Sequence, residues 1–422
     1  MLGSAAASLA ARLERRGGAI VAALALLVLA AGVAYSVVLG PAPRFPDEVE
    51  YLRLADSLAS GAGLSLDGMR PTAFRPPGYP AALAPVVALG GGPVAARALN
   101  FGLLAGAMGL AWLVLRRRGH PVAAGLAPVL MAGYPVLFYT AGTIYPQTLA
   151  LLGVMALVLM LGTEAPGVAL GALAGLLAGA LTLTVPTLVF LVPVAVVWLA
   201  ARAGAGRRLA VGALCLLVAA VTIGAWSVRN VQAVGAPVFV STNSGYNLVL
   251  GNAERTSPNA GVNADVRREI APAARLDEVE RDVYLRNQAL KWVALNPGRA
   301  ARLYALKVLN HFNYRNELRT SSRASALADV AVALTYGALL LIVLARLALA
   351  LARRAPLSAF EGLLLAIYAL SALATAVAFT RIRFRVPFDP LLAMLAALAL
   401  ERALEWWLPQ RRPSADARTD AT

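Results

Sequence analysis

Two adjacent carboxylates, Asp47 and Glu48, follow the first hydrophobic segment and are the leading candidates for catalysis. They begin the stretch DEVEYLRLADSLA, whose apolar residues recur at helical spacing and predict a helix. A carboxylate at a helix N-terminus is held rigidly and kept ionised, as a general base must be. The same spacing also fits a capping role, with Asp47 as N-cap and Glu50 completing a capping box. The two roles are compatible.

Arginines form the second group of candidate residues. Arg75 lies in AFRPPGYP, where the neighbouring prolines restrict the backbone to an extended course and present the guanidinium group. Arg381, Arg383 and Arg385 alternate in RIRFR, just before VPFDP. Guanidinium groups bind phosphate in a bidentate manner, which suggests a site for an anionic ligand. Contact with lipid headgroups, or pairing with Asp389, is the competing explanation.

A polar, glycine-containing region supplies the third group. WSVRN leads into VSTNSGYNLVLGN, which contains the candidates Asn243, Tyr246 and Asn252. Asparagine side chains of this kind could bind sugar hydroxyls. They could equally satisfy the backbone of the turns in which they lie.

The composition indicates which elements must position these residues. Hydrophobic residues make up 59% of the 422 residues, and the mean hydropathy is +0.69. Several uncharged runs reach the ~20 residues that a helix needs to cross a bilayer. The sequence therefore predicts an all-α polytopic membrane protein.

The distribution of charge and the scarcity of metal ligands argue against a nucleic-acid-binding protein and against a histidine-based metalloprotein. The formal net charge is +16, but the arginines cluster at the ends of apolar segments, as membrane topology requires. Basic stripes with interleaved aromatics, which are typical of nucleic-acid binding, are missing from the sequence. Two histidines and a single cysteine, Cys215, argue against a histidine-based metal centre and an internal disulfide. We expect no metal, no cofactor and no nucleic-acid partner.

Ten transmembrane segments are predicted, at residues 18–39, 94–115, 121–139, 146–163, 166–183, 186–201, 209–228, 326–345, 357–379 and 387–408. With ten segments, the arginine clusters at 12–16, 116–118, 202–208, 353–354 and 411–412 all fall on one side, which is then cytoplasmic. Counting the short apolar run at 79–90 as a further span would break this agreement. We therefore expect that run to be a juxtamembrane or re-entrant helix on the outer face.

The same topology leaves two long outer segments, at about 40–93 and 230–325. Helical sequence at 276–312 of the second segment is interrupted by an Asn-Pro-Gly breaker at 296–298. The chain then divides into an N-terminal transmembrane module (1–229) that includes the first outer loop, an outer segment (230–325), C-terminal transmembrane helices (326–412) and a polar tail (413–422). The composition of the tail predicts disorder.

The motifs FPDEVEYLRLADSLASGAG, PTAFRPPGYP, WSVRN with VSTNSGYNLVLGN, and RIRFRVPFDP resemble, in this order, those of bacterial family-39-type glycosyltransferases. These enzymes belong to the GT-C superfamily, with the protein O-mannosyltransferases and the aminoarabinose transferase of lipid A. The resemblance spans most of the chain and implies a GT-C-type bundle of about ten transmembrane helices with juxtamembrane helices on the outer face.

The resemblance also implies a reaction and its partners. The enzyme would transfer a sugar, with inversion, from a polyprenyl-phosphate donor to a hydroxyl of a lipid, glycan or protein acceptor. Transfer would occur at the outer, periplasmic face of the bacterial cytoplasmic (inner) membrane, among membrane lipids. Two departures from many relatives are Gln147, in place of an acid, and Val185, where an arginine often precedes the proline. Donor sugar and acceptor stay open.

Roles for individual residues follow from the same resemblance. Asp47 corresponds to the general base, with Glu48 as second choice. Preorganised cations would stabilise the negative charge that builds on the departing phosphate. Besides Arg75 and the three arginines of RIRFR, the candidates are Arg229 and Lys307, and Tyr79 is a further substrate-binding candidate.

Two other functions stay open at this point. An envelope enzyme of the O-antigen ligase or polymerase kind would use a diphosphate-linked donor and place its catalytic residues in a large late loop. A non-catalytic transporter would carry charges or broken helices near the middle of the membrane. The predicted transmembrane segments are nearly free of charge, which argues against a transporter.

Overall fold

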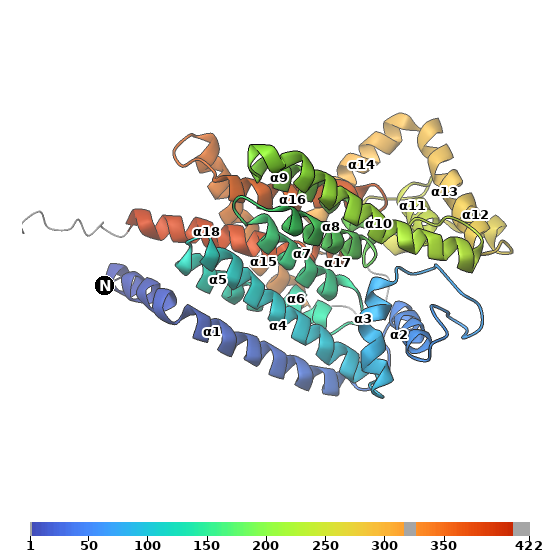
Figure 1. The fold of residues 1–422 in the computed structure, drawn as a ribbon, viewed down its shortest axis with the longest axis horizontal. Helices are drawn as coiled ribbons and strands as arrows, with labels where there is room; N and C mark the ends of the chain where they lie inside the picture. The colour runs from blue at the N-terminus through green and yellow to red at the C-terminus, as the bar shows by residue number, and fades with distance from the viewer. Residues whose placement is uncertain (1, 316–325, 408–422) are drawn as a thin grey trace, which may run out of the picture.

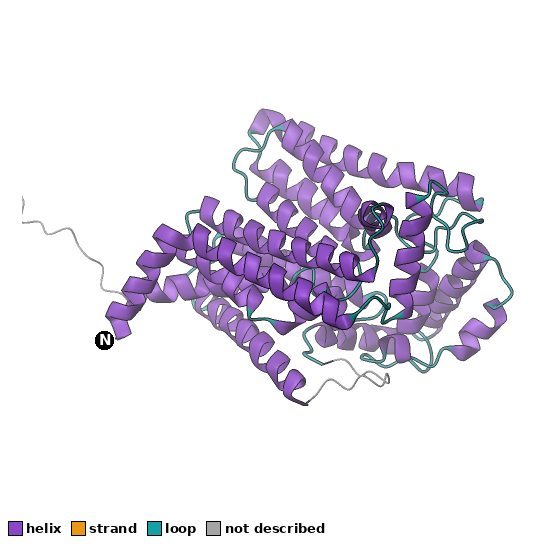
Figure 2. Ribbon diagram, turned by 90° about the horizontal axis from the view of Figure 1, so that it is seen from below, coloured by secondary structure: helices purple, strands orange, loops and turns teal. Residues whose placement is uncertain are grey.

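The computed structural model describes residues 2–315 and 326–407 of the chain. Throughout these residues the regular structure is helical, and the β-structure is limited to an isolated bridge between Ser65 and Pro71. Figure 2 shows helices joined by loops over the described chain. The prediction of an all-α protein is confirmed. The tail at 413–422, expected to be disordered, lies outside the described residues.

One set of helices forms an elongated bundle. Its members are α1 (Leu2–Leu39), α4 (Pro93–Arg117), α5 (Pro121–Ala132), α6 (Pro135–Ala141), α7 (Gln147–Leu161), α8 (Val168–Thr182), α9 (Leu191–Arg202), α10 (Arg208–Val234), α15 (Ala326–Leu351), α16 (Ala359–Ala376) and α18 (Asp389–Trp407). Short 3₁₀ helices precede α9 and α10, namely η1 (Pro186–Phe190) and η2 (Ala205–Arg207). The predicted division of the chain at 229/230 falls inside α10.

The remaining helices gather at one end of the bundle. They are α2 (Pro46–Ala59), α3 (Gly78–Ala88), α11 (Ser244–Gly251), α12 (Arg267–Ile270), α13 (Glu278–Leu295), α14 (Pro297–His311) and α17 (Ile382–Arg385), with η3 (Gly261–Asn263) and η4 (Ala271–Ala273). Figure 1 shows α2, α3 and α11 to α13 at the end of the bundle opposite the N-terminus of α1. We call this end the site end.

Among the described residues, five helices are long and apolar enough to cross a membrane: part of α1, then α4, α10 with η2, α15 and α16. The pair α5–α6, bent by 63°, makes a sixth if it counts as one span. Each of the ten predicted segments coincides with a helix or a pair of helices, and α7, α8 and η1–α9 are shorter apolar ones. The protein is therefore a multi-pass membrane protein.

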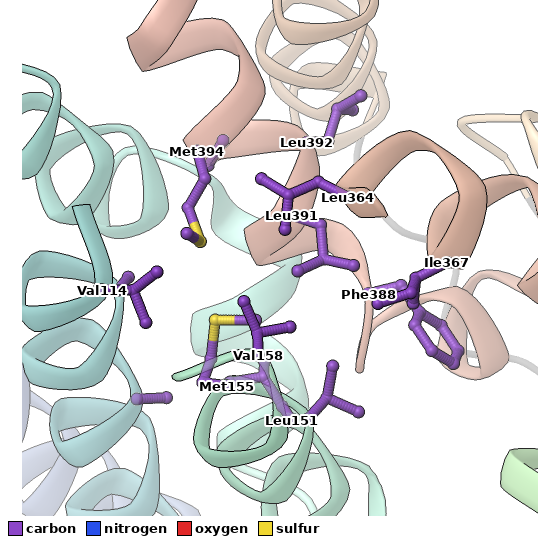
Figure 3. Packing of buried hydrophobic residues seen from close by; sticks show 14 of the residues in the cluster. Val114, Leu151, Met155, Val158, Leu364, Ile367, Phe388, Leu391, Leu392 and Met394 are labelled. Atoms are coloured by element: carbon purple, nitrogen blue, oxygen red, sulfur yellow. The ribbon is translucent and has the colours of Figure 1, made fainter. Parts of the chain in front are cut away.

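Apolar side chains from distant parts of the sequence fill the centre of the bundle. Figure 3 shows Val114 of α4, Met155 of α7, Leu364 of α16 and Leu391 of α18 within one cluster, and all are nearly inaccessible to solvent. Small residues allow close helix contacts elsewhere: a Cβ on Gly175 of α8 would lie 2.2 Å from a backbone oxygen of α10. Tight packing of this kind gives the site end a rigid base.

Two local predictions for the site end hold. The run at 79–90 forms α3, which packs against α2 and, at 11 residues, extends only ~16 Å, too short to span a bilayer. The helical segment at 276–312 divides into α13 and α14 at the expected breaker, with Pro297 in the first turn of α14. Asp277 and Glu280 form a capping box at the start of α13.

Candidate active site

A cavity of about 310 Å³ opens among the helices of the site end. Five separate segments line it: the first outer loop with α2, the α6–α7 connection, the α8–η1 connection, the residues leading into α11, and the α16–α17 connection. The cavity therefore brings together all of the motif regions on which the resemblance rests, except WSVRN. It also includes the two positions where this sequence departs from its relatives, Gln147 and Val185.

The cavity wall contains an acid–arginine network centred on Asp47. Nη2 of Arg75 lies 2.7 Å from Oδ1 of Asp47, and Nε of Arg75 lies 2.7 Å from an oxygen of Glu50. Nη1 of Arg383 lies 3.3 Å from the other oxygen of Asp47. The Arg75 guanidinium also lies over the ring of Tyr51, with 5.4 Å between guanidinium carbon and ring centroid. Asp47 thus joins the first outer loop to the RIRFR segment.

The electrostatics of Asp47 favour the ionised form. Burial on its own would raise the pKa of this carboxyl, but the positive charges and hydrogen bonds of Arg75 and Arg383 outweigh that effect. The pKa is therefore lower than the ordinary value of 3.8. Asp47 is a carboxylate at neutral pH and can accept a proton, although both of its oxygens are held by guanidinium groups in this state.

The structure contradicts the alternative role of Asp47 as a helix cap. Phe45 occupies the N-cap position of α2, and no side chain caps this end of the helix. Pro46 takes the first helical position, which places Asp47 within the first turn, and Glu50 bonds to Arg75 instead of closing a capping box. The Asp47 side chain is free to face the cavity because the helix does not need it as a cap.

Arg381 and Arg383 carry positive charge that the protein compensates incompletely. Within the described part of the chain, Nη2 of Arg381 and Nε of Arg383 are buried without a hydrogen-bond partner. Burial and the neighbouring charge of Arg383 lower the pKa of Arg381 to about 10. Arg383 lies over the ring of Tyr145 at 5.1 Å and lines the cavity. Arg381 lies behind it, outside the lining.

Arg385 has a different role from the other two arginines. It is fully buried and donates to Oδ1 of Asp389 at 2.9 Å, to the carbonyls of His311 and Asn313 at 2.8 Å, and to the hydroxyl of Tyr134 at 3.0 Å. The pairing with Asp389 considered from the sequence is therefore present for this arginine. Arg385 does not line the cavity. Its bonds anchor the segment that carries Arg383.

Glu48 lies away from the cavity in spite of its position next to Asp47. It is fully buried and accepts hydrogen bonds from the backbone N–H of Arg44 at 2.6 Å and of Ile144 at 3.0 Å. The guanidinium of Arg97, itself fully buried, lies 3.7 Å from Glu48 and donates to two carbonyls of the first outer loop. The geometry favours Glu48 as an anchor of that loop over a role as base.

Two further predicted residues support the cavity from behind. The buried hydroxyl of Tyr79 and the side-chain amide of Asn100 on α4 hydrogen-bond to each other. Arg229, near the end of α10, donates to the carbonyl of Thr72 at 2.8 Å. Neither Tyr79 nor Arg229 lines the cavity. Each holds part of the first outer loop or of α3 against the bundle.

Among the predicted residues of the second outer segment, one lines the cavity and the others pack outside it. Asn243 lines the cavity, whereas Tyr246 packs in the apolar cluster beneath α11. Nζ of Lys307 donates to the carbonyl of Ala378 at 2.7 Å and to Oδ1 of Asn252 at 3.2 Å. Burial lowers the pKa of Lys307 to about 8. Lys307 and Asn252 tie α14 to α11 and to the end of α16, outside the cavity lining.

Gln147 is a lining residue that the candidate list lacked. It is 4% exposed, and among the described residues its Oε1 has no hydrogen-bond donor. The resemblance had drawn attention to this position, because many relatives carry an acid there. Tyr51, Tyr145 and Thr184 are further lining residues that sequence reasoning missed as candidates. Tyr51 could have been found, because it lies four residues after Asp47 on the same predicted helix, whereas Tyr145 and Thr184 are distant in the sequence.

Glu278 at the start of α13 connects two walls of the cavity. Its Oε1 accepts hydrogen bonds from the backbone N–H of Ala73 at 2.9 Å and from the Thr242 hydroxyl at 2.7 Å. Its Oε2 accepts from the Thr72 hydroxyl at 2.5 Å. Nothing in the sequence distinguishes Glu278 from the other acids at this helix start. The structure shows it holding the loop before Arg75 against the residues before α11.

Fold and site together define an all-α, multi-pass membrane protein with an acid–arginine cavity at one end of its helix bundle. No protein-family profile matches the chain, and no curated protein matches its sequence. Among solved structures, the chain is similar to ArnT from Cupriavidus metallidurans, crystallised bound to undecaprenyl phosphate. The sequences are 16% identical, the TM-score is 0.42, and the match covers 91% of this chain and 77% of that one. A likeness at this level assigns neither activity nor ligand to the chain.

Proposed function

We propose that the protein is a glycosyltransferase of the GT-C type, which transfers a sugar from a polyprenyl-phosphate donor to an acceptor hydroxyl. The observation that carries this proposal is the contact of Asp47 with Arg75 and Arg383 on the wall of one cavity. A carboxylate can take the proton of a hydroxyl nucleophile, and guanidinium groups can bind a phosphate leaving group. The site end is then the outer face of the cytoplasmic membrane, as the arginine clusters predict.

The proposed reaction is a single displacement with inversion. The acceptor oxygen attacks the anomeric carbon of the sugar and passes its proton to Asp47. The bond from that carbon to the phosphate oxygen breaks, and its electron pair leaves with the polyprenyl phosphate. Arg75 and Arg383 stabilise the charge that develops on the phosphate, and Arg381 adds a third positive charge behind them.

Donor binding would also free the base. In the structure described here both oxygens of Asp47 accept hydrogen bonds from guanidinium groups, which lowers the pKa of this carboxyl. A donor phosphate competes for the same guanidinium groups, so the pKa of Asp47 would rise toward its ordinary value and the carboxylate would become a better base. The proposal therefore places donor binding before acceptor activation.

Another part of the cavity lining suits a sugar. Hydroxyl and amide side chains of Ser241, Asn243, Ser244 and Asn247 line it. Neutral groups of this kind bind sugar hydroxyls without competing for the phosphate. The neutral amide of Gln147 completes the polar lining near the α6–α7 connection.

A transporter is the alternative that one structural observation favours, namely the 63° bend between α5 and α6. Transporters bind their substrates at broken helices of this kind. However, Tyr134 at this break bonds to Arg385, which in turn pairs with Asp389. The two buried charges at this break are thus paired with each other, which argues against a substrate site there, and among the described residues only Oδ2 of Asp389 in this group has no hydrogen-bond partner.

The test is sugar transfer or donor hydrolysis by the protein in nanodiscs, with a panel of polyprenyl-phosphate sugars. Asp47→Asn should reduce turnover by about 10²–10⁴-fold while the protein stays folded, because it removes the base. Asp56→Asn is the matched control: the same change, at an exposed position of the same helix, should leave turnover unchanged. Full activity of Asp47→Asn would refute the proposed base. Turnover with polyprenyl-diphosphate donors alone would favour the ligase or polymerase alternative.

A further inference from the structure

An apolar groove of about 440 Å³ adjoins the cavity. α13 and α14 form its sides, with Leu290 and Val293 on one helix and Ala300 and Ala301 on the other. Figure 1 shows these two helices projecting from the bundle as a V. The groove is bounded toward the cavity by residues of α11 and of the end of α16.

The groove and the cavity share part of their lining. Leu248 and Val377 belong to both, so one layer of side chains separates the two spaces there. Leu248 follows Ser244 and Asn247 on α11, and both of those polar residues line the cavity. A molecule that crosses this boundary meets hydrocarbon on the groove side, and hydroxyl and amide groups on the cavity side.

The groove lies beside the end of a membrane-spanning helix. The hydroxyl of Tyr304, which lines the groove, donates to the carbonyl of Leu373 near the end of α16 at 2.9 Å. Large apolar side chains on the same two helices are exposed, among them Leu290 (56%), Leu295 (70%) and Leu309 (68%). Exposed apolar side chains beside a membrane-spanning helix suit the boundary of the bilayer hydrocarbon, as on the apolar face of an interfacial helix. The space between the two helices is therefore a suitable site for a lipid chain.

We propose that the groove binds an acyl chain of a membrane lipid whose hydroxylated head enters the cavity, so that the acceptor of the proposed transferase is a lipid. The identification as acceptor rests on the proposed function, whereas the binding of the chain does not. The polar cavity-lining groups of α11, Ser244 and Asn247, are neutral. They suit a hydroxylated head, while the arginines that suit a phosphate leaving group lie on the other segments of the lining.

Photolabelling of the protein in nanodiscs tests the chain position. The probe is a phosphatidylglycerol with a diazirine near the end of one acyl chain. We expect the label on residues 289–304. Ala301→Trp fills the groove and should reduce this label about tenfold, because overfilling an apolar site is strongly unfavourable. Ala305→Trp is the matched control, since Ala305 lies one turn further along α14, is exposed and does not line the groove. Equal labelling of the two variants would overturn the proposal.

A second probe tests the position of the head. A phosphatidylglycerol with the diazirine in its glycerol head should label residues 241–248, and Ala301→Trp should reduce this label as well. Labelling by the chain probe without labelling of 241–248 would refute the lipid as acceptor. So would labelling of the groove by a photoactivatable polyprenyl phosphate in preference to the phospholipid, since the groove would then belong to the donor.

The labelling experiment separates this inference from the proposed function. Asp47→Asn should be labelled like the wild type, because Asp47 does not line the groove. If Asp47→Asn keeps its turnover while labelling follows the expected pattern, the proposed base is wrong and the lipid site stands. If Asp47→Asn loses its turnover while the groove stays unlabelled, the transferase stands and the lipid site is wrong.

Discussion

Asp47 and Arg383 form an ion pair across the cavity although 336 positions separate them in the sequence, with 3.3 Å between Oδ2 and Nη1. Arg75 holds the other carboxylate oxygen. The network places a carboxylate and two guanidinium groups within the reach of one small substrate. Under the proposed function these groups are the base and the phosphate ligands, and the state of the base depends on whether the arginines are occupied.

Arg383→Gln should weaken donor binding more than acceptor binding. The change removes a charge-assisted contact to phosphate, so the KM for the donor should rise by roughly 10- to 100-fold. Initial rates at varied donor and acceptor concentrations measure the effect. Arg53→Lys, at an exposed position of α2, is the control and should behave like the wild type. An equal rise of both KM values would contradict a role at the phosphate.

The lowered pKa of Asp47 predicts a pH-dependent contribution to stability. The unfolded chain binds a proton at this carboxyl more readily than the folded protein does. The carboxylate therefore stabilises the fold above its unfolded pKa, and this contribution is lost as the pH falls through the folded pKa. The difference in thermal stability between wild type and Asp47→Asn should be largest near neutral pH and shrink below about pH 4. A difference that does not change between neutral and acidic pH would show that the ion pairs do not favour the carboxylate.

Glu48→Gln should lower the free energy of unfolding and leave the turnover of the folded protein unchanged. The change leaves the buried guanidinium of Arg97 without its carboxylate, and breaking a buried pair of this kind costs about 3–5 kcal/mol. Thermal unfolding in detergent measures the loss, and the folded fraction should retain turnover. Glu164→Gln removes an exposed partner of Arg118 and should cost less than about 1 kcal/mol. If Glu48→Gln unfolded like the wild type but lost its turnover, Glu48 would return as the candidate base.

Glu278→Gln, a change outside the cavity lining, should make the segments that flank the cavity more mobile. The amide cannot accept at both positions where the carboxylate holds the backbone and hydroxyl donors of residues 72, 73 and 242. Hydrogen exchange should become faster at 72–75 and 241–244, and KM should rise with a smaller change in kcat. Glu280→Gln keeps the capping box of the same helix and serves as the control. Unchanged exchange in both segments would rule out the anchoring role.

The helices at the ten predicted spans could be predicted because length and hydrophobicity are local properties. Among the described residues five of them, or six with the bent pair α5–α6, are long and apolar enough to cross a membrane. Each expected span coincides with a helix, and the Asn-Pro-Gly breaker separates α13 from α14 as expected. The gathering of the motif regions at one end of the bundle could also be inferred, since the predicted topology places them all on one side of the membrane.

The contacts within the site could not be predicted, because they depend on side-chain directions. Arg381, Arg383 and Arg385 alternate in the sequence, and an extended chain would point all three to one side. The chain instead turns into the short helix α17, so Arg383 reaches the cavity while Arg385 is buried against Asp389. Asp47 and Glu48 diverge for the same reason, since neighbours on a helix face different directions. The anchoring role of Glu278 could not be predicted, because its partners are a backbone group and hydroxyls that are distant in the sequence.

The ion pair between Asp47 and Arg383 also has a consequence for biosynthesis. At a synthesis rate of ~5–20 residues per second, the 336 residues between the two partners take roughly 20–70 s to produce. During that time α2 can already lie at the membrane, with Arg75 bonded to both Asp47 and Glu50 and with Arg383 not yet present. The nascent protein thus holds a site that lacks the arginine of its second side. Insertion of the segment before α18 completes the network, and under the proposed function this ties the onset of activity to the last stage of membrane assembly.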